Sequence, residues 1–190
     1  MAEPVSFQTV LTYLTLISVP VGVFYHVLTL WNSQKARQTQ ILLQLYQSMS
    51  NPENQKRFWE FMSMSWDDYD DFMSRYSPDV DQDHAAQRQA FWNQYDGLGL
   101  LVKDNVVDLN TVYRTRGGIV INVWFKFETI IKGLRIDEEK EIGDEYMNDF
   151  EYLANEMIGI RKRKGLPLPL NQLHPTSTLY EQYAKPQSYI

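Results

Sequence analysis

The sequence contains no cysteine among its 190 residues. Disulfides, thiolate zinc sites and cysteine nucleophiles are therefore excluded. Histidine is almost as scarce, and none of His26, His84 and His174 follows a glutamate by three residues. A carboxylate-bridged di-metal bundle needs that Glu-x-x-His spacing on two of its helices. The sequence therefore predicts no such metal centre.

Nucleophile-elbow, P-loop and dinucleotide-binding motifs are also missing. Two acidic groups have some metal-binding or catalytic potential. The first group lies at an expected helix start, where the helix dipole stabilises negative charge and the side chains face water. Its carboxylate oxygens suit a hard cation, but no Gly turn or distal Glu completes a metal-binding loop. The second group lies on one later helix and has no partner residue with which it could act in acid–base catalysis. We predict no catalytic, cofactor-binding or metal-ligating residue. The two groups are Asp67, Asp68, Asp70 and Asp71, and Asp149, Glu151 and Glu156.

Charge of either sign is absent from residues 7–31. A helix needs about 20 mostly apolar residues to cross a bilayer core, so this run predicts a transmembrane helix, loosened by Pro20, after a short stub at residues 1–6. Two alternatives stay open, a cleaved signal peptide and a buried core helix. The start of the stub, MAEP, lacks the positive charge with which a signal peptide begins.

No lysine or arginine precedes Lys35, and Arg37 follows it closely. Basic residues next to a membrane helix favour the cytoplasmic side. We therefore predict a single-pass cell-membrane protein with its N-terminus outside and residues 32–190 in the cytoplasm. The net charge of −6 argues against nucleic-acid binding.

Residues 32–165 carry apolar residues at helical spacing and predict an all-α domain, a helical bundle. The Pro-rich residues 166–190 predict an extended tail with a short turn near Tyr180 to Tyr183. Residues 119–131 are the most apolar part of the domain, and their length favours a core helix over a strand. The expected helices cover residues 33–50, a segment starting at Pro52, residues 66–76 opened by a Ser65-x-x-Asp68 capping box, residues 84–103, a segment capped by Asp108 and reaching Leu134, and residues 143–164.

The helix expected at residues 84–103 contains two glycines that lower its helix propensity, Gly97 and Gly99. Their use would be the close approach of a neighbouring helix. The apolar seam of this helix is expected at Phe91, Tyr95, Leu98 and Val102.

One face of the expected membrane helix carries small and hydroxyl side chains within about 80° of arc. Such residues let membrane helices approach closely. The stripe predicts contact with a transmembrane helix of another subunit or of a second copy; the alternative is a monomeric anchor whose threonines bond their own backbone. The stripe consists of Thr15, Ser18, Gly22, His26 and Thr29.

Two groups of basic residues are expected on the cytoplasmic side, where they could touch the membrane surface. Each can attract anionic headgroups when close to them, and a solvated helix end is the alternative for the second group. The candidate lipid contacts are Lys35 and Arg37, and Arg161, Lys162, Arg163 and Lys164.

Several segments together resemble a prokaryotic family, domain of unknown function 4760, over about residues 5–160. The segments are ARQTQ at 36–40, LLQLY at 42–46, NPE at 51–53, WDDYDDF at 66–72, GLG at 97–99 and DFEYL at 149–153. The resemblance implies a short N-terminal membrane segment followed by a helical domain, and it implies no activity.

Three functions fit these observations. The preferred one is a membrane-anchored interaction protein, a scaffold or accessory subunit of a membrane complex without catalytic chemistry of its own. The alternatives are an enzyme or ligand-binding bundle tethered to the membrane, and a signalling module that responds to dimerisation of its anchor. A deep polar pocket in the domain would favour the enzyme or ligand-binding bundle.

Overall fold

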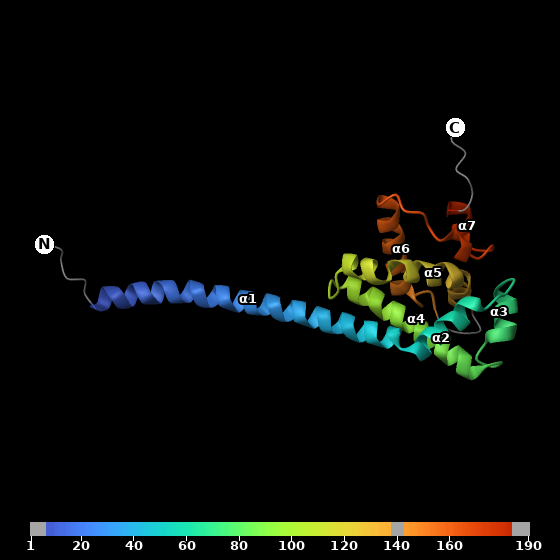
Figure 1. The fold of residues 1–190 in the computed structure, drawn as a ribbon, viewed down its shortest axis with the longest axis horizontal. Coiled ribbons are helices and arrows are strands. Elements are labelled where there is room, and N and C mark those ends of the chain that lie inside the picture. Colours follow the sequence, from blue (N-terminus) through green and yellow to red (C-terminus); the bar gives the residue numbers. More distant parts are fainter. Residues whose placement is uncertain (1–6, 138–142, 184–190) are drawn as a thin grey trace, which may run out of the picture. The chain divides into compact units, whose positions relative to one another are not determined.

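The computed structural model describes residues 7–137 and 143–183, and within these ranges every regular element is a helix (Figure 1). The all-α prediction is confirmed. The chain divides into two compact units, with the boundary between Asn51 and Pro52. The elements are α1 (Phe7–Ser50), α2 (Pro52–Ser63), α3 (Tyr69–Tyr76), α4 (Gln82–Lys103), α5 (Leu109–Ile136), α6 (Asn148–Arg163), the 3₁₀ turn η2 (Leu170–Gln172) and α7 (Thr178–Tyr183).

Helix α1 lies in the first unit and runs for 44 residues without a break. The helix expected at 33–50 is its continuation, because no glycine or further proline interrupts the backbone hydrogen bonds there. By length and composition α1 can cross a membrane, and its most apolar 18-residue window is entirely unburied. A core helix would bury that window.

The second unit begins at Pro52, the first residue of α2, as the Asn-Pro-Glu sequence predicts. The expected start of α3 was wrong. Asp68, and not Ser65, caps the helix by accepting the backbone N–H of Asp71, while the Asp71 carboxylate accepts the backbone N–H of Asp67. A carboxylate competes better than a hydroxyl for these N–H groups because it carries charge.

Helices α4, α5 and α6 form the core, with α6 packed against both of the others. Aromatic rings join them: Trp92 of α4 meets Phe127 of α5, and Phe150 of α6 contacts both Tyr95 and Trp124. All five side chains are buried. Each such pair contributes about 0.5–1.5 kcal/mol beyond its buried area. The apolar run of α5 therefore lies in the core, as expected.

The start of α6 lies at Asn148, and not near Gly143 as expected. Gly143 and Met147 take left-handed conformations, which a continuous helix cannot contain. The first N–H groups of α6 are satisfied from outside the helix, because Asp96 of α4 accepts those of Asp149 and Phe150. Tertiary contact sets this boundary.

The segment after Gly165 is less extended than its prolines predict. Gly165 ends α6 with a positive φ of 65°, as a C-terminal glycine commonly does. Beyond it, η2 forms, the expected turn appears as α7, and Leu173 and Ser177 are buried. The prolines prevent a long helix, but residues between them pack on the helical unit. Residues 184–190 lie outside the described part of the chain.

Candidate functional site

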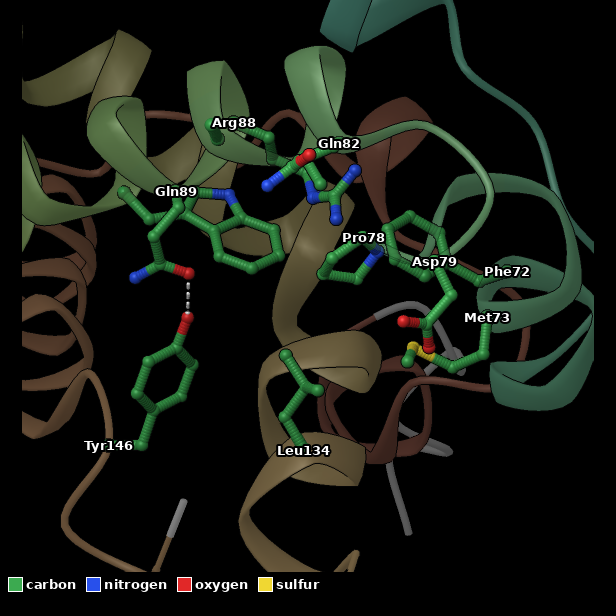
Figure 2. Close-up of a pocket in the computed structure, with 12 residues that line it drawn as sticks. Phe72, Met73, Pro78, Asp79, Gln82, Arg88, Gln89, Leu134 and Tyr146 are labelled. Carbon is green, nitrogen blue, oxygen red and sulfur yellow. Dashed lines mark hydrogen bonds between the residues drawn. The ribbon is translucent and has the colours of Figure 1, made fainter. Parts of the chain in front are cut away.

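A cavity of about 410 Å³ lies in the helical unit, with walls from α3, α4, the last turn of α5 and the segment before α6 (Figure 2). We call it the Arg88 cavity. Ligand pockets in proteins commonly enclose about 300–1,000 Å³. The described residues that line it are Phe72, Met73, Pro78, Asp79, Gln82, Ala85, Ala86, Arg88, Gln89, Trp92, Leu134 and Tyr146.

Arg88 is the unusual member of this lining, because only 6% of it is exposed. Its guanidinium donates one hydrogen bond, from Nη2 to the carbonyl oxygen of Tyr76 at 3.0 Å. The Nε and Nη1 atoms are buried and have no acceptor among the residues that the structure describes. The guanidinium carbon lies 4.9 Å from the centre of the Phe72 ring and 5.3 Å from that of Trp92. Two aromatic rings and one carbonyl thus hold the charge in place.

The other polar groups of the cavity are few. Tyr146 donates its hydroxyl hydrogen to the Gln89 side-chain oxygen, and Figure 2 shows these two residues facing each other on the wall. The indole nitrogen of Trp92 is buried and has no hydrogen-bond acceptor within residues 7–137 and 143–183. Asp79 and Gln82 also belong to the polar lining. Among the described residues, the cavity therefore offers a guanidinium and one carboxylate in largely apolar walls.

Burial lowers the pKa of the Arg88 guanidinium, because the charged form loses hydration. The guanidinium nevertheless stays protonated, because the arginine side chain does not lose its proton in proteins. Burial also raises the pKa of the Tyr146 phenol and keeps its hydroxyl neutral. The arrangement presents a fixed positive charge beside a neutral phenol, which suits the binding of an anion.

A second buried polar cluster centres on Glu128 of α5, which is completely buried. Its carboxylate accepts hydrogen bonds from the hydroxyls of Ser177 at 2.6 Å and Thr178 at 3.0 Å, and it pairs with Lys132 at 2.6 Å. A buried carboxylate is stable only with such partners. Glu128 thus fastens the C-terminal segment onto α5.

The residues of the predicted helix–helix stripe lie along α1. The hydroxyls of Thr15, Ser18 and Thr29 donate to backbone carbonyls about one turn earlier, at 2.8–3.1 Å. A Cβ atom added at Gly22 would meet nothing within 4 Å. The hydroxyl hydrogens are therefore already used, and contact with another helix would rest on close packing at Gly22 and on His26.

Four of the six basic residues predicted to contact lipid have partners within the protein. The ammonium of Lys35 lies 4.2 Å from the centre of the Trp31 ring. At the end of α6, Arg161 donates to the carbonyl of Pro167, while Lys162 and Lys164 lie over aromatic rings. Lys162 and Lys164 remain exposed, as does Arg163 between them.

Four of the seven acidic candidates form structural contacts. The carboxylates of Asp68 and Asp71 accept hydrogen bonds from backbone N–H groups around the start of α3. Asp71 also forms an ion pair with Arg75 at 2.7 Å. Among the described residues no cluster of His, Asp and Glu could hold a metal ion. Two of the candidates on α6 form ion pairs with different helices, and these are Asp149 with Lys103 at 2.8 Å and Glu151 with Arg135 at 2.5 Å.

Sequence reasoning missed Arg88 and Glu128, although each left a signal. Arg88 follows Ala85 by three residues and precedes Trp92 by four, and both neighbours are buried, so a charge occupies the core face of α4. Glu128 interrupts the most apolar run of the domain. A charge on an otherwise apolar face indicates either a partner or a ligand.

Comparison with known proteins places the chain in a family. No curated protein and no solved structure matches it. A family described as a domain of unknown function, DUF4760, matches residues 16–157, which include the C-terminal part of the apolar run and the helices that form the Arg88 cavity. Because this match covers most of the chain, the protein belongs to the DUF4760 family.

Proposed function

We propose that this protein is a membrane-anchored interaction protein, a scaffold or accessory subunit of a membrane complex with no catalytic chemistry of its own. Residues 7–31 cross the cell membrane once, the N-terminus lies outside, and residues 32–190 lie in the cytoplasm. The observation that carries the proposal is α1, a continuous helix with an unburied apolar window and no charge over residues 7–31.

The dimensions of α1 support this placement. Residues 7–31 span about 37 Å as a helix, against about 30 Å for the hydrocarbon core. Trp31 lies at the end of the uncharged run, and Lys35 rests against its ring. An aromatic ring and a lysine are typical of the interface on the cytoplasmic side. The rest of α1, residues 32–50, carries Lys35 and Arg37 and is rich in glutamine, so it extends beyond the hydrocarbon core.

The stripe on α1 supplies the contact with a partner. Ser18 and Gly22 form a small-xxx-small pair, which lets two membrane helices approach closely. The partner is a transmembrane helix of another subunit or of a second copy of this chain. Nucleic acid is not a partner, since the chain carries a net charge of −6.

Two measurements test the placement on the full chain in its own membrane. Alkaline carbonate should leave the protein in the membrane fraction, and detergent should release it. A tag at the C-terminus should resist protease in intact spheroplasts, while a tag at the N-terminus should be cleaved. Release by carbonate would refute the anchor, and the reverse tag pattern would refute the orientation.

The interaction role has its own test, a pull-down after gentle detergent extraction. A membrane protein recovered in fixed stoichiometry supports the scaffold or accessory role, and recovery of the chain alone in monomeric form contradicts it. A ligand-binding bundle is the second candidate, and the Arg88 cavity is the observation that favours it.

A further inference from the structure

We propose that the Arg88 cavity binds a small monocarboxylate with an apolar body, whose carboxylate accepts hydrogen bonds from the Arg88 guanidinium. This proposal is independent of the membrane anchor, because every residue that carries it lies in the second unit.

The argument for an anion begins with the buried charge. A buried arginine is normally paired with a carboxylate, because burying a lone charge costs free energy. In the described part of the chain, the negative charge of Asp81 attracts Arg88 electrostatically, but the two side chains form no ion pair. The Nε and Nη1 atoms of Arg88 have no acceptor there. A bound carboxylate would supply charge and acceptors together.

The guanidinium is held ready for such a ligand. The Phe72 and Trp92 rings lie within 5.3 Å of its central carbon, and Tyr76 accepts from Nη2. A donor that is fixed before binding loses little conformational freedom on binding. Figure 2 shows the guanidinium of Arg88 at the cavity wall, near Gln82 and Pro78.

The walls select the rest of the ligand. Phe72, Met73, Pro78 and Leu134 give the cavity an apolar surface that suits a hydrocarbon chain or ring. The guanidinium of Arg88 carries a single positive charge, which one carboxylate can neutralise. The chemistry therefore favours a monocarboxylate with an apolar body over inorganic phosphate.

The test uses the full chain in lipid nanodiscs and fluorine NMR of 4-fluorophenylacetate as the probe, with empty nanodiscs as the blank. The unmodified protein should bind the probe saturably. The neutral isostere 4-fluorophenylacetamide should bind at least about tenfold more weakly, because it lacks the charge-assisted hydrogen bonds. Inorganic phosphate should not displace the probe at equal concentration.

Two variants localise the site. Arg88→Gln removes the charge, and Ala86→Phe fills the cavity from an exposed position on α4 while keeping Arg88. Each should weaken probe binding at least about tenfold. The matched control is Arg75→Gln, which removes an exposed arginine of α3 outside this cavity and should leave binding unchanged.

Three results would overturn the proposal. They are no saturable binding by the unmodified protein, equal affinity for the acid and the amide, and unchanged affinity in both Arg88→Gln and Ala86→Phe. If Arg88→Gln fails to fold, because Arg88 also bonds the end of α3, Ala86→Phe decides the question. If phosphate displaced the probe as effectively as an equal concentration of added probe does, the inference that the ligand has an apolar body would be refuted.

Discussion

Gly99 of α4 lies directly against the backbone of Asp149 at the start of α6. A Cβ atom added to Gly99 would lie 1.9 Å from the Asp149 carbonyl oxygen and 2.5 Å from its carbon. The neighbouring Asp96 accepts the N–H groups of Asp149 and Phe150. The missing side chain at position 99 therefore permits the backbone contact through which α4 caps α6.

This contact predicts opposite effects at two glycines. Gly99→Ala should destabilise the domain by about 1–3 kcal/mol, because the backbone of α6 must move away. Gly97→Ala should be neutral or stabilising by up to about 1 kcal/mol, since Gly97 is exposed and alanine favours helix. Thermal unfolding of the full chain in detergent, followed by tryptophan emission, measures both. Equal effects of the two substitutions would contradict the contact.

The same pair shows how far sequence reasoning reaches. Close approach of a neighbouring helix is expected at both glycines, and it is confirmed at Gly99 but not at Gly97. Helical periodicity marks a face, but it does not give the distance to a neighbour. The expected seam of α4 includes Phe91, which is only half-buried, whereas the adjacent Trp92 is fully buried, so the core face is rotated slightly.

Tertiary contacts explain what periodicity could not predict. The helical class, the Asp108 cap and the apolar face of α5 follow from local sequence and are confirmed. The start of α6 depends on Asp96, which is 53 residues from Asp149 in sequence. The Arg88 cavity depends likewise on residues from α3, α4 and α5. Packing brings these distant residues together, and no short stretch of the sequence shows in advance that they will meet.

The buried Glu128 cluster predicts a large loss of stability when its charge is removed. Glu128→Gln should destabilise by about 2–4 kcal/mol, because Lys132 and two hydroxyls then face a neutral amide. Ser177→Ala should cost about 1.5–3 kcal/mol, the value of a hydrogen bond to a charged group. Urea unfolding provides both values, and the exposed Glu145→Gln serves as the control. A Glu128→Gln variant as stable as that control would refute the role of the cluster.

The His84–Asp81 pair predicts a pH dependence on the surface of α4. The two side chains lie 2.6 Å apart. Hydrogen bonding to Asp81 raises the pKa of His84 above 6.5, and the same bond lowers the pKa of Asp81 below 3.8. For His84, the stabilisation is complete below pH 6.5 and is lost as pH rises through its higher folded pKa. For Asp81, it is present above pH 3.8 and is lost as pH falls through its lower folded pKa.

An NMR titration of the His84 ring tests this pair. Asp81→Ser removes the charge but keeps a good N-cap for α4. The His84 pKa should therefore fall toward 6.5 in this variant while the helix stays intact. An unchanged pKa would show that Asp81 does not hold the proton on His84.

The basic end of α6 predicts binding to anionic membranes. Changing Arg161, Lys162, Arg163 and Lys164 to Gln should weaken binding of the second unit, residues 52–190, to phosphatidylserine vesicles about tenfold or more, since each basic residue near the surface contributes about 1 kcal/mol. Vesicles of phosphatidylcholine alone are the control. Sedimentation with vesicles measures the binding. Equal binding by parent and variant would show that this end of α6 is a solvated helix terminus without a role in lipid binding.

The stripe on α1 gives the last prediction. Because its hydroxyls already donate within the helix, association depends on the close approach that Gly22 permits and on the imidazole of His26. Gly22→Ile should block that approach, and adding His26→Leu should weaken association further. Val21→Ile, one residue away and on another face, is the matched control and should associate like the parent. A membrane two-hybrid assay or crosslinking in the native membrane measures association. If the Gly22 and His26 variants associate as strongly as Val21→Ile, the stripe is not an interface.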